Sequence, residues 1–227
     1  TSRKRFPRQA AEEDIMNVSK RMMRNPLWVD EDDSMKKAME LLKERGIRHL
    51  PVLKGGEKLV GIVSERDIKQ ASPSPATALE IREIYYLLDK VKVKQIMTRR
   101  PYTISSTAPI EEAALIMREK KIGCIPVVDE GKMVGILTET DILDAFIESM
   151  GVSGPGYRVE LALPNRPGML FEVLKLMNDF EANIVSVATA AHDDPGKKVL
   201  ILRLETKNYK LLKSALKKAG HEMLSAD

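Results

Sequence analysis

Apolar residues follow one pattern in two separate stretches of the chain. In residues 35–42 and 110–117 they recur at the spacing of one helix face. They are Met35, Ala38, Met39 and Leu42 in the first stretch, and Ile110, Ala113, Ala114 and Met117 in the second. A short extended piece, PLWV or PYTI, precedes each helix, and two strand-like runs joined by a glycine-containing turn follow it. A second helix is expected from Ser64 or Thr138, so the pattern predicts the order β-α-β-β-α twice.

The two stretches are copies of one unit. VGIVSERDI at residues 60–68 and VGILTETDI at 134–142 are nearly the same string, and with a one-residue gap about a third of the aligned positions match. The alignment pairs Pro26 with Pro101, Gly61 with Gly135 and Asp67 with Asp141. A repeat of this kind decides the fold class, so the two copies are expected to share one fold.

After the second copy the pattern changes. Residues 151–156, GVSGPG, read as a glycine-rich hinge. The segments that follow are YRVELAL, MLFEVLKLMNDF, ANIVSVATAA, VLILRLE, NYKLLKSALKKAG and HEML. Their predicted order, β-α-β-β-α-β, is that of a small ferredoxin-like domain. Between the copies, residues 71–92 carry a Pro/Ser turn and then a helix, as a linker would.

These motifs resemble two known families. GIRHLPV with LVGIVSERDI, and IGCIPVV with MVGILTETDI, resemble the cystathionine-β-synthase (CBS) domain, whose tandem pairs form a disc called a Bateman module. NRPGML and the later ANI resemble the ACT domain, although an aspartate is commoner there than Asn165. The combined order is similar to that of AcuB-type proteins of acetoin utilisation. The implied fold class is α/β (α+β). The segments are a basic N-terminal segment 1–16, CBS copies 17–70 and 93–150, a linker 71–92, a hinge 151–156 and an ACT domain 157–227.

Ser64 and Asp67 have two explanations. A hydroxyl followed three positions later by a carboxylate at a helix start is a capping box, which needs no ligand. The same geometry places free amides and a hydroxyl where a phosphate can bind, and the aspartate offers two acceptor oxygens to a ribose diol. Capping boxes favour Glu or Gln, whereas both copies have Asp, which favours the ligand. Gly61 would let a neighbouring strand or ring approach closely.

The resemblance to CBS pairs implies an adenine nucleotide (AMP, ADP or ATP) or S-adenosylmethionine as the regulatory ligand, with the aspartates holding the ribose. The implied residues are Arg48, His49, Leu50, Ile62, Ser64, Arg66 and Asp67 in the first copy, and Gly123, Cys124, Ile125, Ile136, Thr138 and Asp141 in the second. Each cleft also draws on the partner copy, so Met22, Met23, Met97 and Thr98 are expected at one cleft or the other. Arg48 and His49 align with Gly123 and Cys124, so a di- or triphosphate should favour the first cleft.

In the C-terminal domain the loop NRPGML places a helix start after a strand. Its exposed amides suit a carboxylate, although Gly168 relieving a tight turn is the alternative. The resemblance to ACT domains implies an amino-acid ligand at Asn165, Gly168, Met169, Asn183 and Ile184. The ligand site of that family lies between subunits, and an open edge strand needs covering, so at least a homodimer is expected.

Composition limits the other functions. The net charge of +4 comes from 37 basic and 33 acidic residues, and only TSRKRFPRQ is a basic cluster, which we interpret as a solvated terminus. No recognition helix rich in Arg, Asn or Gln is found, so control through DNA is not favoured. The one cysteine lies in the apolar run KIGCIPVV, which indicates core packing and a reducing compartment. No apolar run approaches a membrane span, and we expect a cytoplasmic protein.

The sequence contains no catalytic motif and no metal-spaced cluster, since there are three histidines and two of them fall in the C-terminal domain. The leading hypothesis is therefore a non-enzymatic regulator, without metal or cofactor, that senses an adenine nucleotide in the CBS pair and an amino acid in the ACT domain. The alternative is an assembly subunit of an unidentified metabolic enzyme, with ligand affinity lost.

Overall fold

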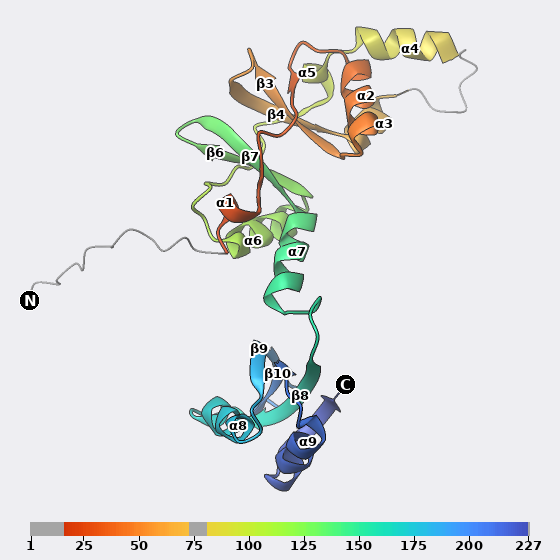
Figure 1. Cartoon of the computed structure of the whole chain (residues 1–227). Helices are drawn as coiled ribbons and strands as arrows, with labels where there is room; N and C mark the ends of the chain where they lie inside the picture. The colour runs from red at the N-terminus through yellow and green to blue at the C-terminus, as the bar shows by residue number, and fades with distance from the viewer. Residues whose placement is uncertain (1–15, 73–80, 227) are drawn as a thin grey trace, which may run out of the picture. The chain divides into compact units, whose positions relative to one another are not determined.

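The computed structural model describes residues 16–72 and 81–226 of the chain (Figure 1). Most of the basic N-terminal segment and residues 73–80 of the linker lie outside this part. The chain divides between Ile142 and Leu143 into two compact units. Both copies of the repeat belong to the first unit up to this point, and the ferredoxin-like domain belongs to the second.

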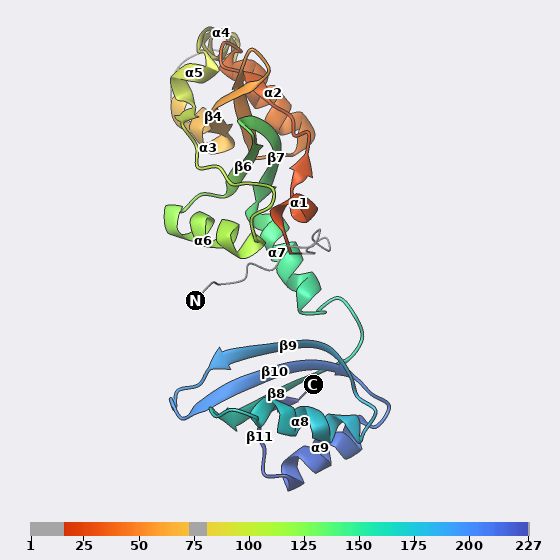
Figure 2. The same cartoon turned by 90° about the vertical axis from the view of Figure 1, so that its left-hand side faces the viewer.

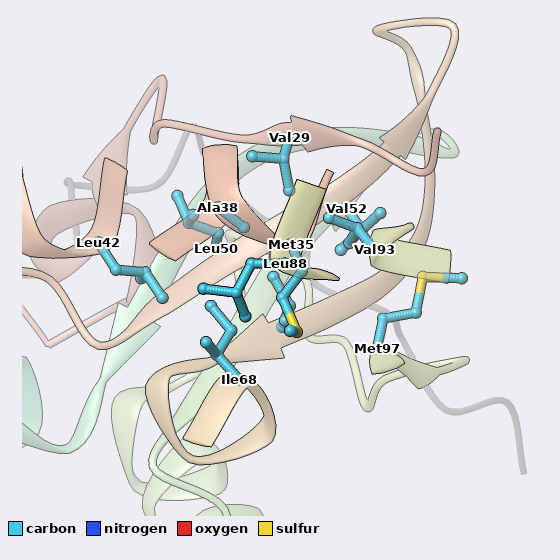
Figure 3. Packing of buried hydrophobic residues seen from close by; sticks show 11 residues of the cluster. Val29, Met35, Ala38, Leu42, Leu50, Val52, Ile68, Leu88, Val93 and Met97 are labelled. Atoms are coloured by element: carbon cyan, nitrogen blue, oxygen red, sulfur yellow. The ribbon is translucent and has the colours of Figure 1, made fainter. Parts of the chain in front are cut away.

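The helix α2 (Met35–Arg45) shows why each copy folds as predicted. The Ser34 side chain accepts a hydrogen bond from the Lys37 amide at 3.2 Å and caps the start, while Gly46, with a φ of 62°, ends the helix in the left-handed conformation. The predicted apolar stripe is buried against the sheet. Figure 3 shows Met35, Leu50 and Ile68 converging in this core together with Leu88 from the linker helix α4 (Ile81–Lys90).

Each copy contributes a small sheet, and each sheet contains one strand that comes from the far side of the repeat boundary. The strand orders are β2-β3-β4-β5 and β1-β7-β6. The bounds are β1 Met23–Arg24, β2 Val29–Asp30, β3 His49–Lys54, β4 Lys58–Ser64, β5 Thr98–Arg99, β6 Cys124–Asp129 and β7 Lys132–Thr138. β1 precedes α2 in the chain but pairs with β7, with Met23 opposite Ile136. β5 precedes the second copy but pairs with β4, with Thr98 opposite Ile62. The two copies therefore exchange strands.

The predicted element order is confirmed, with shorter first strands than expected. PLWV contributes only its last residue to β2, and PYTI contributes only an isolated bridge between Ile104 and Val127. The remaining helices of the repeats are α1 Val18–Arg21, α3 Glu65–Ala71, α5 Val93–Ile96, α6 Ile110–Lys120 and α7 Glu139–Ser149. α1 and α5 stand before the exchanged strands and were not predicted, because one helical turn carries no readable periodicity.

The second unit has the predicted order β-α-β-β-α-β. Its elements are β8 Tyr157–Pro164, α8 Met169–Asn178, β9 Asn183–Ala191, β10 Lys197–Glu205, α9 Tyr209–Lys218 and β11 Glu222–Ala226. The sheet order is β11-β8-β10-β9, and all neighbours are antiparallel. Figure 2 shows α8 and α9 on the same face of this sheet. Their apolar stripes, including Val173, Met177 and Leu212, are fully buried against β8 and β10.

Candidate functional site

The side chains of Ser64 and Asp67 close a capping box at the start of α3. The Asp67 Oδ2 atom accepts hydrogen bonds from the Ser64 amide and the Ser64 hydroxyl, both at 2.7 Å, and the Asp67 amide donates to Ser64 Oγ at 3.3 Å. Thr138 and Asp141 form the same three bonds at the start of α7, with the same distances. The capping explanation is therefore correct in both copies, and an aspartate is long enough to close the box.

The box leaves one carboxylate oxygen of each aspartate for a ligand. Oδ2 already accepts two hydrogen bonds, and the hydroxyl proton is committed to it. Within residues 16–72 and 81–226, no hydrogen bond reaches the Oδ1 atom of Asp67 or of Asp141. The expectation that both oxygens face a ribose diol is corrected to one, and each half-buried aspartate can accept from a ribose hydroxyl through Oδ1 alone.

The exchanged strands pair antiparallel with β4 and β7, a few residues before these capping boxes. A Cβ on Gly61 of β4 would lie 2.5 Å from the Met97 sulfur and 2.9 Å from the Thr98 carbonyl oxygen, so the glycine is what allows β5 to approach. By the same pairing, Met22 and Met23 lie beside the second box. The structure thus assigns the exchanged residues: Met97 and Thr98 to the first copy's sheet, and Met22 and Met23 to the second.

His49 lies at the junction of the two copies. A Cβ on Gly123 would lie 3.4 Å from His49 Cε1 and equally far from Glu139 Oε2, so both side chains approach the same backbone. Burial lowers the pKa of His49 and the neighbouring Arg48 lowers it further, while the Asp67 and Glu139 carboxylates oppose this shift. The predicted cation is therefore disfavoured at His49, and Arg48 supplies the permanent charge. Sequence reasoning missed Glu139, although it aligns with Glu65 directly after the hydroxyl residue.

The apolar members of the predicted set differ in exposure. Leu50 and Ile125 are fully buried, Ile136 is buried, and Ile62 is half-buried. Neither Leu50 nor Ile125 therefore presents surface to a ligand, which corrects the expectation that they line the clefts. Cys124 is a buried free thiol whose pKa is raised to about 12, mainly by burial, so it is a core residue, as the sequence predicted.

A cavity of about 790 Å³ lies beside the first copy, between α2 and α3. Its floor includes Leu42, Ile47 and Ile68, and its rim includes Arg48 and the Glu65–Lys69 ion pair, with Nζ to Oε1 at 2.6 Å. Of the predicted nucleotide residues it contains Arg48 alone. Arg66, the other predicted cation of this copy, is exposed on α3.

In the ferredoxin-like domain, the five predicted residues lie at two ends of the sheet. The Asn165 amide donates to the Gly196 carbonyl oxygen at 2.8 Å, which places the loop before α8 beside the β9–β10 turn. Gly168 caps α8 with a φ of 87°, so the tight-turn explanation of this glycine is correct. Asn183 and Ile184 begin β9 at the other end, where Asn183 lines a cavity of about 720 Å³. Nine residues of β9 span about 26 Å, so one chain does not bring the five together.

No group of three or more His, Cys, Asp or Glu side chains is arranged to hold a metal ion among the residues that the structure describes. Nor does this part of the chain contain a helix long and apolar enough to cross a membrane.

Comparison with known proteins gives the same architecture. A family model described as CBS domain matches residues 13–74 and 93–148, and one described as TTHA0829-like ACT domain matches residues 155–226. A CBS domain-containing protein of Dictyostelium discoideum is 32% identical over 58% of this chain and 91% of its own length. A solved Vibrio cholerae protein, provisionally assigned to acetoin utilization (AcuB), is 28% identical with a TM-score of 0.50, over 60% of this chain and 94% of that chain. The CBS-pair protein CBSX2 of Arabidopsis thaliana is 30% identical with a TM-score of 0.51, over 58% and 94%.

Proposed function

Because the chain belongs to the CBS-domain family and carries an ACT domain after its CBS pair, we propose that it is a non-enzymatic regulator that binds an adenine nucleotide or S-adenosylmethionine in the pair. The observation that carries this proposal is the free Oδ1 atom of Asp67 and of Asp141. Each lies at a helix start, beside a half-buried hydroxyl residue, and follows the strand with which the exchanged strand of the other copy pairs. An acceptor in this setting fits a ribose hydroxyl, while the backbone of the exchanged edge strand offers donors and acceptors to a base.

Charge around the two boxes supports a preference of the first for phosphates. Arg48 and Arg66 are exposed beside the first box. The exchanged strands do not add to the difference, because Arg99 of β5 and Arg24 of β1 lie at equivalent positions, opposite Gly61 and Gly135. The second box has Gly123 at the position aligned with Arg48, and Thr140 at the position aligned with Arg66. Arginines bind phosphate oxygens through charge-assisted hydrogen bonds, so a di- or triphosphate fits the first cleft and a less anionic adenosyl ligand fits the second.

The ACT domain is proposed to bind an amino acid between two copies of the chain. β9 is an edge strand on which Val185 and Val187 are 36% and 43% exposed. Antiparallel pairing of two such edges would bring the start of β9 in one copy beside the end of β9 in the other. Asn183 of one copy would then face the Gly168 loop of the second copy, which a single chain keeps apart. The homodimer and the amino-acid site thus support one another.

Two measurements test the nucleotide proposal. The purified protein is denatured and the released small molecules are weighed by mass spectrometry, and its melting temperature is recorded with AMP, ATP or S-adenosylmethionine. A ligand at about one hundred times its Kd stabilises the folded state by about 2.7 kcal/mol, which is a measurable rise. No released adenosyl compound, together with an unchanged melting temperature for all three, would contradict the proposal.

The second candidate is an assembly subunit of a metabolic enzyme, of the acetoin-utilisation type, that binds no nucleotide. It is favoured by one observation, namely that each capping box is complete through Oδ2 without a ligand. The same titration decides between the two, because an assembly subunit would keep its melting temperature in all three nucleotides and change it only with its partner.

A further inference from the structure

The helix α7 begins at the second capping box and is followed by residues 150–156, which lead to β8 of the ACT domain. Its first turn holds Asp141, and its last residue, Ser149, lies beyond the division between the two units. Eleven residues of helix extend about 16 Å. Ala145 is the one buried residue of α7, all of which the structure describes. Ala145 lies in the middle of the helix, and Asp144, Ile147 and Glu148 line a cavity together with Gly151 and Val185.

The C-terminal end of α7 is fixed to the ACT sheet. The Ser186 hydroxyl of β9 donates to the Met150 carbonyl oxygen at 2.9 Å, and Arg203 Nη2 of β10 donates to the Gly154 carbonyl oxygen at 3.0 Å. Gly151, with a φ of 62°, lies so close to Val185 that a Cβ would stand 2.4 Å from Val185 Cγ1. The predicted hinge is therefore attached to β9 and β10 in the second unit.

A β-bulge makes this attachment possible. The pairing of β9 with β10 shifts register between Arg203 and Leu204, where Ser186 and then Ile184 are the partners, so Val185 is left as the extra residue. The bulge turns Val185 toward Gly151. A bulge redirects a side chain and leaves one residue without its cross-strand pairing. The contact between Val185 and Gly151 therefore depends on this irregularity of the strand.

The first copy lacks this connection. Its equivalent helix, α3, has seven residues and ends at Ala71, and the hydroxyl of the C-cap Ser72 donates to the Ile68 carbonyl oxygen at 2.7 Å. The two capping boxes are otherwise alike in every bond. The copies therefore differ in that α7 is followed by a segment attached to the ACT sheet, whereas α3 is followed by residues outside the described part of the chain.

We propose that α7 couples the second cleft, and not the first, to the β9–β10 edge of the ACT domain. Loosening or stabilising the first turn of α7, at Asp141, loosens or stabilises residues 150–156 and β9, where the ACT ligand and the dimer contact are proposed. For its ligand-driven part this coupling rests on the proposed nucleotide binding, but its mechanical part needs no ligand. A helix of this length with one buried residue is marginal by itself, so loosening one end loosens the other.

Hydrogen exchange of the full chain, followed by mass spectrometry without any ligand, tests the mechanical part. Asp141→Ala and Asp67→Ala remove equivalent capping boxes and serve as matched variants. We expect Asp141→Ala to speed exchange about fivefold in residues 150–156 and 183–187, and Asp67→Ala to leave both segments unchanged. Thr138→Ala, which removes the hydroxyl alone, gives a smaller effect of the same sign. The proposal is overturned if Asp141→Ala and Thr138→Ala speed exchange only near residues 139–145, or if Asp67→Ala acts equally on β9.

A second arm adds AMP. In the natural chain, AMP should slow exchange at residues 138–145 and also at 183–187, whereas Ser186→Ala with Arg203→Met should keep the first effect and lose the second. Protection that reaches β9 unchanged in this double variant would overturn the coupling. If AMP protects neither segment of the natural chain, the nucleotide proposal fails for AMP, and the ligand-free arm still decides the coupling.

Discussion

Gly135 lies directly against Met22: a Cβ on the glycine would stand 2.7 Å from the methionine sulfur and 2.9 Å from the Met23 carbonyl oxygen. The sulfur belongs to a flexible side chain and can move, but the carbonyl oxygen is part of the exchanged strand. The glycine therefore fixes the distance between β1 and β7.

Gly135→Ala and Gly61→Ala should each destabilise the CBS pair by about 1 to 3 kcal/mol, because the added methyl group must displace backbone. Gly123→Ala is the matched control, since its Cβ would have only the side chains of His49 and Glu139 near it, at 3.4 Å. Urea unfolding measures all three. A Gly135→Ala protein as stable as Gly123→Ala would show that the strand shifts without cost.

Asp67→Gln and Asp67→Ala separate the structural and the ligand-binding roles of this carboxylate. A glutamine at this position still closes a capping box, so Asp67→Gln should keep the unfolding free energy within about 0.5 kcal/mol, whereas Asp67→Ala should lose about 1 kcal/mol. Both variants should weaken nucleotide binding at the first cleft, because both remove the Oδ1 acceptor. Calorimetry reads the affinity and urea the stability. Full nucleotide affinity in Asp67→Gln would exclude the carboxylate from the site.

The two clefts should rank phosphates differently. Asp141→Gln should remove binding at the second cleft, so that the first is measured alone, and Asp67→Gln should do the reverse. The ratio of ATP affinity to AMP affinity should be larger at the first cleft, because Arg48 and Arg66 have no counterparts at the second. Raising the salt from low to high should reduce this preference, since the arginines are exposed. Calorimetry at two salt concentrations measures both ratios. Equal ratios would mean that other residues hold the phosphates.

His49 should make the CBS pair less stable in acid. Burial lowers the pKa of His49 below its ordinary value of 6.5, so the unfolded chain takes up the proton first. The stability that the neutral His49 side chain contributes to the folded state is fully present above pH 6.5, and it is lost as the pH falls through 6.5 toward the folded pKa. His49→Gln should therefore lose less stability between pH 7.5 and 5.5 than the natural chain does, as measured by urea unfolding. An identical loss in both proteins would contradict this assignment.

Val187→Lys should separate a dimer that pairs through β9. A lysine on the edge strand opposes strand addition. The control is Leu211→Lys, which changes an apolar residue on α9 that is more exposed than Val187, at 61% against 43%. Sedimentation at micromolar concentration should give one chain for Val187→Lys and two for the natural chain and for Leu211→Lys. A monomeric natural chain, or dimers in all three, would exclude this edge.

The sequence predicted what is local. Periodic helices, the glycine approach at Gly61, the buried Cys124 and the capping boxes could all be read from residues a few positions apart. Strand exchange could not, because β1 and β5 have two residues each and no alternation, although a methionine before each of them was a repeated signal. The motifs around Gly168 and Asn183 also could not show, from sequence alone, that these two residues lie at opposite ends of one sheet. That fact depends on the register of β8, β9 and β10.

The exchange of β1 and β5 bears on how the protein is made. Met23 leaves the ribosome more than one hundred positions before Ile136, the residue it pairs with. The nascent first copy must therefore keep its own leading strand unpaired until nearly the whole second copy has been synthesised. Such long-range pairing slows folding and leaves an edge exposed to other chains meanwhile. A gene fragment that ends after the first copy would lack β5 and would leave β1 without its partner strand β7.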